Sequence, residues 1–156
     1  MKKSRFKKLL AVLLAAVLIA CSFTGCAANG KEIMNRIYGL YNNLALDSTV
    51  TSQDGKKSST FKLSGKAEET KYATIDLGEE KEFNTVVLKE SGKKVTLFEI
   101  YGSNNADSDY KFLYQSDCIE GGHTCFLGDV SYRYLRIFVN QASGSFKLTA
   151  AEVYNI

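Results

Sequence analysis

Alternating hydrophobic and polar residues mark short extended segments along most of this chain. Ala73, Ile75 and Leu77 fall on one face of such a segment, whereas Thr74 and Asp76 fall on the other. A period of two is typical of a half-buried antiparallel strand. We therefore expect a strand here, with one face in a core.

A second apolar segment, Phe83–Leu88, follows a charged turn that opens at Gly78. Its residues Val86, Val87 and Leu88 are consecutive, which is typical of a strand covered on both faces. We expect this strand to lie at the centre of the core.

Similar segments recur to the end of the chain, separated by loops rich in glycine, serine and asparagine. About eight short strands at regular spacing predict an all-β fold, a β-sandwich or jelly roll. The predicted strands are 60–63, 72–77, 83–90, 95–102, 110–116, 123–127, 133–140 and 147–154.

The first 25 residues have a different pattern. A basic start, MKKSRFKK, precedes the apolar run LLAVLLAAVLIA, which is too short for a stable membrane span and is typical of a signal peptide. The segment Phe23–Cys26 resembles the lipobox of bacterial lipoproteins, with Cys21 in a second, overlapping match. We predict lipidation at Cys26 and a protein anchored on the extracellular side of a bacterial membrane; soluble secretion is the alternative.

Residues 26–42 are predicted to form a tether. Ile33, Ile37, Leu40 and Tyr41 recur at helical spacing, which predicts a short helix that either docks on the domain or acts as a spacer. The folded domain is expected to occupy residues 43–156.

Removal of the signal peptide changes the charge. The chain has 20 Lys and Arg against 17 Asp and Glu, and five of the basic residues lie in the first eight positions. The remainder carries 15 against 17 and is slightly acidic. Composition thus gives no support for a nucleic-acid-binding surface.

Several motifs together resemble the discoidin domain, the C-type domain of coagulation factors V and VIII, which is also similar to bacterial galactose-binding modules and fucosidase C-terminal domains. The resemblance implies a jelly-roll sandwich with a ligand, most often a glycan, bound by loops at one end. The motifs that carry it are NLAL at 43–46, IDLG at 75–78, VVL at 86–88, FEIYGSN at 98–104, RYLRI at 133–137 and AEVY at 151–154.

Relatives of this kind often hold a structural calcium ion. Asp54-Gly55 and Glu152 stand at matching places, and Thr60, with the serines before it, offers further oxygen donors. Lys56-Lys57 departs from the family pattern by placing two cations beside this site. The alternative is a solvated aspartate in an ordinary turn.

The resemblance also suggests glycan-binding residues. The chain has no tryptophan, so Phe61 and Phe146 are the candidate rings for stacking on a sugar, while Asn104, Asn105 and His123 are candidate hydrogen-bonding partners. The alternatives place Phe61 in the core and His123 in an exposed turn.

Two further cysteines, Cys118 and Cys125, flank Gly121-Gly122. A two-residue hairpin turn at these glycines would place the cysteines opposite each other, within disulfide range. Export to an oxidising exterior permits such a bridge. Two free thiols, or a thiol–imidazole pair with His123, are the alternatives.

The sequence contains no phosphate-binding loop, nucleophile elbow or cysteine and histidine metal cluster. We therefore expect a non-catalytic surface domain that binds carbohydrate. An adhesion module for a protein or lipid partner is the alternative, and a structural domain without a ligand is a third.

Overall fold

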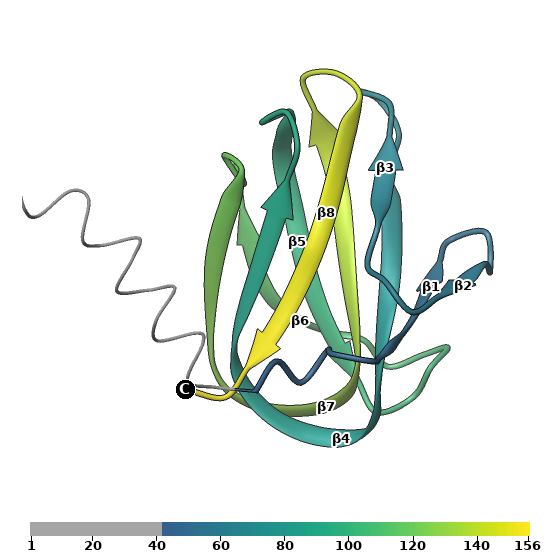
Figure 1. Ribbon diagram of the computed structural model, residues 1–156, viewed down its shortest axis with the longest axis vertical. Coiled ribbons are helices and arrows are strands. Elements are labelled where there is room, and N and C mark those ends of the chain that lie inside the picture. Colours follow the sequence, from purple (N-terminus) through teal and green to yellow (C-terminus); the bar gives the residue numbers. More distant parts are fainter. Residues whose placement is uncertain (1–41) are drawn as a thin grey trace, which may run out of the picture. The chain divides into compact units, whose positions relative to one another are not determined.

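The computed structural model describes residues 42–156, which form strands and no helix (Figure 1). There is accordingly no helix in this part of the chain that could cross a membrane. The predicted N-terminal helix and the lipidation site at Cys26 lie outside the described residues. The strands are β1 (Thr49–Ser52), β2 (Lys57–Ser58), β3 (Leu63–Gly65), β4 (Lys71–Glu90), β5 (Val95–Ser103), β6 (Lys111–Ser116), β7 (Gly122–Ala142) and β8 (Phe146–Tyr154).

Two long strands, β4 and β7, run through both layers of the sandwich. Residues 71–76 of β4 pair with the second half of β7, and residues 73–76 also pair with β1. Residues 85–90 pair with β8, and residues 85–89 also pair with the start of β7. The β4–β7 register shifts between Asp76 and Lys81, where Gly78 has a φ of 86°. A positive φ suits glycine, so the chain bends here without ending the strand. The predicted charged turn at Gly78 is therefore a corner within one strand.

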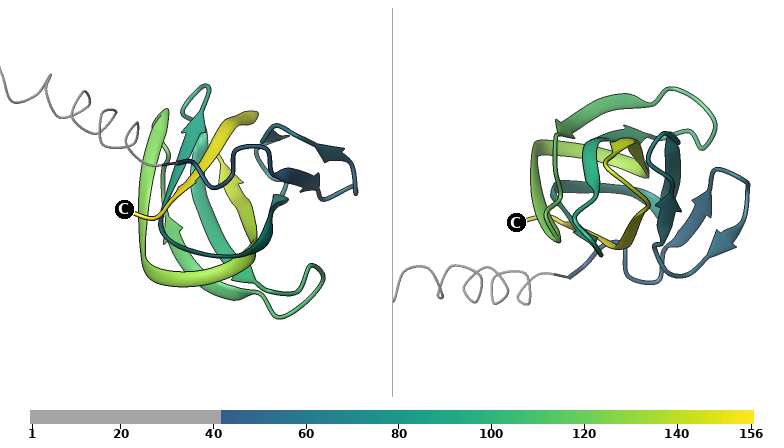
Figure 2. Two further views of the ribbon diagram at one scale, coloured as in Figure 1. Left: turned by 60° about the horizontal axis from the view of Figure 1, so that its bottom comes forward. Right: turned by 90° about the horizontal axis from the view of Figure 1, so that it is seen from above.

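All strand pairs are antiparallel, and the order is β2-β1-β4-β7-β5-β6, with β8 on β4 and β3 on β8. Because β4 and β7 bend, the sheet that these strands form folds over itself and encloses a core (Figure 2). The predicted all-β sandwich is confirmed. The short strands β1 and β2 were not predicted.

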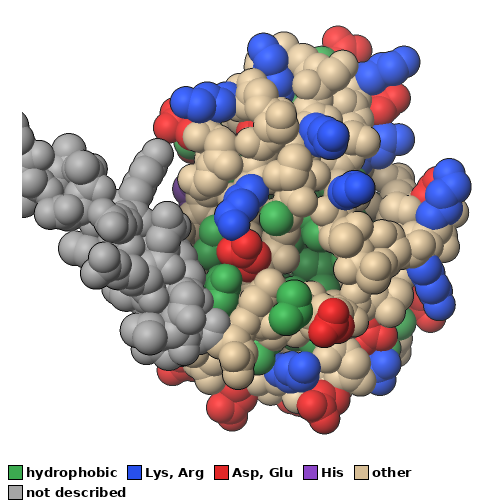
Figure 3. Space-filling view, viewed as in Figure 1, with side chains coloured by type: hydrophobic (Ala, Val, Ile, Leu, Met, Phe, Trp, Pro, Cys, Tyr) green, Lys and Arg blue, Asp and Glu red, His purple; other side chains and the backbone are tan. Residues whose placement is uncertain are grey.

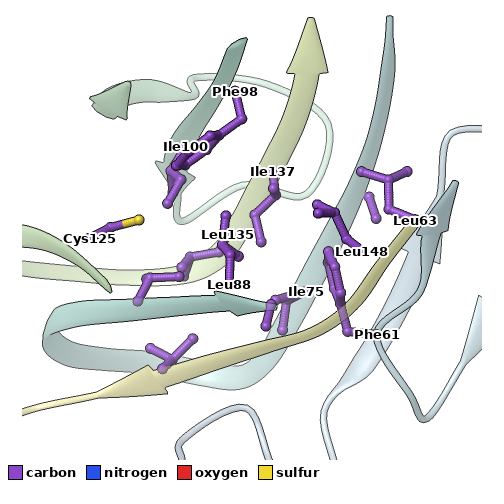
Figure 4. Close-up of a cluster of buried hydrophobic side chains, with 14 of the residues drawn as sticks. Phe61, Leu63, Ile75, Leu88, Phe98, Ile100, Cys125, Leu135, Ile137 and Leu148 are labelled. Carbon is purple, nitrogen blue, oxygen red and sulfur yellow. The ribbon is translucent and has the colours of Figure 1, made fainter. Parts of the chain in front are cut away.

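The core contains the residues that the alternation placed inside. Ile75, Leu135 and Ile137 are at most 1% exposed (Figure 4). Val86 and Val87 are buried too, as expected for a strand covered on both faces. Burial of each large apolar side chain contributes about 1.5–3 kcal/mol relative to exposure. These contacts hold the two layers together.

Phe61 and Phe146 also belong to this core, with 7% and 2% of their surfaces exposed. Phe146 begins β8 and pairs with Gly65 of β3, where a glycine leaves room for the ring. Both rings are packed against apolar neighbours and offer no face to a ligand. Neither ring is therefore available to stack on a sugar as predicted, and the core alternative for Phe61 is confirmed.

The predicted hairpin around Gly121-Gly122 does not form. β6 ends at Ser116, the Gly121 carbonyl accepts the N–H of Glu90 at 3.2 Å, and Cys125 lies opposite Val86 of β4. β7 therefore pairs with β4 rather than with the segment that precedes it. Cys118 and Cys125 are free thiols, and the predicted disulfide is absent. The reason is that the hairpin that would place the two cysteines opposite each other does not form.

The domain begins at a fixed point beside β8. The side-chain oxygen of Asn43 accepts the N–H groups of Ala45 at 3.0 Å and Val153 at 2.9 Å, and the N–H of Leu44 donates to the Val153 carbonyl at 2.8 Å. The NLAL motif thus joins the entry of the domain to its last strand.

Candidate functional site

A groove of about 490 Å³ lies on the outer face of the sheet formed by β1, β4 and β7. The outward positions of paired strands form its floor: Thr74 lies opposite Arg136, and Asp76 lies opposite Tyr134. The β1–β2 turn and the β5–β6 loop form its walls, and both project on the same side of the sandwich (Figure 2). We call this the sheet groove; it is lined by Thr49, Thr51, Ser52, Gln53, Gly55, Lys57, Tyr72, Thr74, Asp76, Ala106, Asp107, Tyr134 and Arg136.

Arg136 is held between two aromatic rings in this groove. Its guanidinium carbon lies 4.7 Å from the ring centroid of Tyr72 and 3.8 Å from that of Tyr110, distances typical of cation–π contacts. Its Nε donates to the Thr74 hydroxyl at 2.9 Å, and one terminal nitrogen donates to the Ala106 carbonyl at 3.2 Å. These bonds use two of the five N–H donors of a guanidinium, so donors remain for a ligand.

Tyr110 ties the β5–β6 loop to this arginine. Its hydroxyl donates to the Ala106 carbonyl at 2.9 Å, and burial raises the pKa of Tyr110 above its ordinary value. The phenol is therefore neutral at physiological pH. The ring, the loop carbonyl and Arg136 form one contact set that positions the loop over the sheet.

A second arginine holds the carboxylate of the groove. Arg133 donates to Asp76 from Nε at 2.8 Å and from a terminal nitrogen at 3.1 Å, and the N–H of Gly78 donates to Asp76 at 2.9 Å. The Arg133 guanidinium is the main reason that the pKa of Asp76 lies below its ordinary value. Asp76 is therefore an ionised hydrogen-bond acceptor. Arg133 also covers the ring of Tyr134, at 4.9 Å from its centroid.

Asn104 and Asn105, two of the predicted ligand-binding residues, lie in the loop that forms one wall of the sheet groove. The Asn104 side-chain oxygen accepts the backbone N–H of Arg133 at 2.8 Å, and that of Asn105 accepts the N–H of Asp107 at 3.1 Å. In this arrangement both side chains shape the loop. Their contact with a ligand stays a prediction.

A scan against protein-family models matches residues 42–153 to the F5/8 type C domain. The chain belongs to this family. The match covers essentially all of the described residues, and it confirms the resemblance that the sequence motifs carried.

Solved structures similar to this F5/8 type C domain include single modules that the chain matches over almost their whole length. Chitosan-binding module 1 of a chitosanase/glucanase from Paenibacillus sp. IK-5 matches with a TM-score of 0.61 and 19% identity, over 73% of this chain and 99% of the module. CpGH89CBM32-6, produced by Clostridium perfringens, matches with a TM-score of 0.59 and 18% identity, over 74% and 100%. At these identities the likeness establishes the fold alone.

Another similar structure is part of a larger enzyme. A GH29 fucosidase from Ruminococcus gnavus matches with a TM-score of 0.60 and 17% identity, over 73% of this chain and 26% of the fucosidase. The F5/8 type C domain thus corresponds to about a quarter of that enzyme's length. No curated protein has significant sequence similarity to the chain.

His123 of the F5/8 type C domain lies outside the sheet groove. It is half-buried at the start of β7, where its Nε2 lies 2.9 Å from the Tyr114 hydroxyl and its ring meets Phe98 edge-on. Burial lowers the pKa of His123, so the imidazole is mainly neutral at physiological pH. The structure therefore does not bring His123 to the other predicted ligand-binding residues.

The predicted calcium ligands lie on different elements of the F5/8 type C domain, Asp54 in the β1–β2 turn and Glu152 on β8 (Figure 1). Asp54 forms an ion pair with Lys56 at 2.7 Å, whereas Glu152 forms one with Lys89 at 2.6 Å. Lys56 is also the main reason that the pKa of Asp54 lies far below its ordinary value. The Thr60 hydroxyl lies 3.2 Å from that of Ser58.

Over residues 42–156, no three His, Cys, Asp or Glu side chains gather in a way that could hold a metal ion. Asp54 and Glu152 are instead each paired with a lysine, and calcium binding stays a prediction.

Sequence reasoning missed the main residues of the sheet groove. The alternation did place Thr74 and Asp76 on an outward face, and Tyr134 and Arg136 alternate in the same way with Leu135 and Ile137. No pattern within one strand, however, shows which outward faces adjoin. Pairing of β4 with β7 brings these four residues together. The available signal in the sequence was an arginine and a tyrosine on the outward face of one predicted strand, which could have indicated a binding surface.

Proposed function

We propose that this F5/8 type C domain binds carbohydrate in the sheet groove, without catalysis, on a lipoprotein held at the outer face of a bacterial membrane through Cys26. The observation that carries the proposal is the combination of Arg136, Asp76 and the ring of Tyr134 in one groove of about 490 Å³. That volume lies within the range of ligand pockets, about 300–1,000 Å³.

The chemistry of the groove suits a sugar ring. Sugars present hydroxyl groups around the ring and C–H groups on its faces, so they pair with charged side chains and with aromatic faces together. The Asp76 carboxylate can accept hydrogen bonds from sugar hydroxyl groups, and the remaining N–H groups of Arg136 can donate to hydroxyl oxygens. Tyr134 offers an aromatic surface beside them.

Fixed geometry supports binding as well. Arg136 is held by two rings and two hydrogen bonds, and Asp76 is held by Arg133. Groups that are already oriented lose little conformational freedom when a ligand binds.

The similar structures support carbohydrate as the ligand class. They include chitosan-binding modules, one of them in complex with chitotriose, and domains within fucosidases. Those ligands belong to those proteins. The support for the proposal is that this chain shares their fold and has a polar and aromatic groove of its own.

A binding role without catalysis agrees with the charge state of Asp76. Glycoside hydrolysis needs one carboxylic acid with a raised pKa and a second carboxylate. The Arg133 guanidinium lowers the pKa of Asp76, which makes this side chain a poor proton donor. Asp76 is better suited to accept hydrogen bonds from a ligand.

The membrane anchor is a separate part of the proposal. Its support is the basic and apolar N-terminal pattern that ends at Cys26. Metabolic labelling of expressing bacteria with a palmitate analogue should mark the protein, and Cys26→Ser should abolish the label. Loss of the label in Cys21→Ser alone would move the anchor to Cys21.

A glycan array probed with the purified protein tests the binding role. We expect a positive signal that Arg136→Ala or Tyr134→Ala lowers at least tenfold, while both variants keep the circular dichroism spectrum of the parent. Phe126→Ala is the matched control, because Phe126 is 63% exposed and does not line the sheet groove.

Binding that survives both groove variants would place the site elsewhere. Absence of any glycan signal would overturn the carbohydrate proposal and would favour a module for a protein or lipid partner.

A further inference from the structure

A second groove, of about 450 Å³, lies on the other side of the β1–β2 turn, between this turn, β3 and the start of β4. We call it the lysine groove. Three of its nine lining residues are lysines, and the full set is Ser52, Gln53, Asp54, Lys56, Lys62, Leu63, Ser64, Lys71 and Tyr72.

The two grooves adjoin. Ser52, Gln53 and Tyr72 line both of them, and the N–H of Gln53 donates to the Tyr72 carbonyl at 3.2 Å. This bond fixes the boundary between the grooves. A ligand longer than one sugar that occupies the sheet groove can therefore extend past Tyr72 into the lysine groove.

The lysine groove carries net positive charge. Lys56 forms an ion pair with Asp54 at 2.7 Å. Lys71 lies 3.6 Å from Glu69, a longer ion pair between two partly exposed side chains. Lys62 is exposed and makes no ion pair within residues 42–156. At least one full positive charge is thus left without a partner carboxylate.

This positive charge does not follow from the composition of the domain. Residues 42–156 contain 13 Lys and Arg against 16 Asp and Glu. Three lysines nevertheless line the lysine groove. Figure 3 shows Lys and Arg side chains, with Asp and Glu among them, on the side that bears β3 and the β1–β2 turn. The sheet groove is balanced by contrast, because Asp76 and Asp107 accompany Arg136 and Lys57 there.

We propose that the lysine groove binds an anionic substituent, a carboxylate, sulfate or phosphate, of a glycan whose neighbouring sugar occupies the sheet groove. The proposal rests on the carbohydrate-binding role proposed above and narrows its ligand to acidic glycans of more than one unit. Lysine suits this task because its ammonium group is a compact charge on a flexible stem, which adapts to planar and tetrahedral anions alike.

The test compares glycans that carry an anionic group with related glycans that lack it. Suitable probes are N-acetyllactosamine with its sulfated and sialylated forms, and tetragalacturonate with its methyl ester. Binding of each is measured by titration calorimetry on the purified protein, at 50 mM and 500 mM salt. We expect the charged member of at least one pair to bind about threefold to tenfold more tightly, and the advantage to shrink at high salt.

A charge-matched pair of variants identifies the groove. Lys62→Gln/Lys71→Gln should remove the advantage of the charged probe and leave the neutral probe unchanged. Lys81→Gln/Lys111→Gln removes the same charge from positions that line neither groove, and it should keep the advantage.

The outcomes separate this inference from the proposed function. If neutral probes bind and Arg136→Ala abolishes their binding, but charge gives no advantage, only the lysine-groove proposal is overturned. An advantage that both double variants reduce equally also overturns it, because general attraction would explain that result. If no probe binds, or if Arg136→Ala has no effect, the proposed function fails and the lysine-groove proposal fails with it.

Discussion

Arg136 on β7 lies 3.8 Å from the ring centroid of Tyr110, which stands just before β6 at the end of the β5–β6 loop. A strand of the sheet thus holds a loop that is 26 residues away in sequence. Arg136 also contacts Tyr72 and Thr74 of β4. One guanidinium on β7 therefore connects the β5–β6 loop to the neighbouring strand in the groove floor. The shape of the sheet groove depends on this contact.

Replacement of Tyr110 should therefore loosen the loop. We expect Tyr110→Ala to lower the free energy of unfolding by about 1–3 kcal/mol, because the ring loses its packing and its cation–π contact. Tyr110→Phe keeps the ring and loses only the bond to Ala106, so it should cost about 1 kcal/mol or less. Urea denaturation measures both. Equal losses for the two variants would show that the hydroxyl, and not the ring, secures the loop.

Acid should weaken the domain through Asp76. Since Arg133 lowers the pKa of Asp76 in the folded state, the pair stabilises the fold above the unfolded-state pKa of about 4, and this stabilisation is lost as pH falls through the lowered folded-state pKa. Both side chains are partly exposed, so we expect a contribution of no more than about 1 kcal/mol.

Asp76→Asn removes the titrating group and tests that expectation. The difference in unfolding free energy between the parent and Asp76→Asn should be largest near pH 6–7 and should shrink toward pH 3. Urea denaturation at several pH values gives this difference. A constant difference between pH 3 and pH 7 would show that Asp76 has the same pKa in both states.

The contact between Gly65 and Phe146 should tolerate no added methyl group. A Cβ at Gly65 would lie 2.8 Å from the buried Phe146 ring, so Gly65→Ala should cost about 1–3 kcal/mol. Gly122→Ala is the matched control, because a Cβ there meets nothing within 4 Å. Thermal or urea unfolding compares the two. Equal stability of both alanine variants would mean that β3 shifts freely away from β8.

The core was predictable from sequence because burial leaves a period of two in each strand. Ala73, Ile75 and Leu77 were expected on one buried face, and at most 4% of each is exposed. The corners were less predictable. A glycine such as Gly78 suggests a turn between two strands. The structure shows instead that β4 pairs with β7 on both sides of Gly78, so a single strand bends there.

The candidate site was predictable only in part because it depends on which strands pair. Asp76, Asn104 and Arg136 all lie in family motifs, but only the β4–β7 register shows that Asp76 and Arg136 lie in one groove. The same limit explains the error about Cys125. A Gly-Gly pair suggests a local hairpin, but the strand that begins there pairs with β4, far away in the sequence.

The two cysteines of the domain should label as thiols without prior reduction. Cys118 is half-buried and Cys125 is fully buried, and burial raises the pKa of the Cys125 thiol to about 12. Because the thiolate is the reactive form, native protein at pH 8 should react with iodoacetamide slowly at Cys118 and hardly at all at Cys125. In 8 M urea without reductant, both should react fully. Peptide mass spectrometry resolves the two positions, and labelling in urea only after reduction would show that a disulfide joins them.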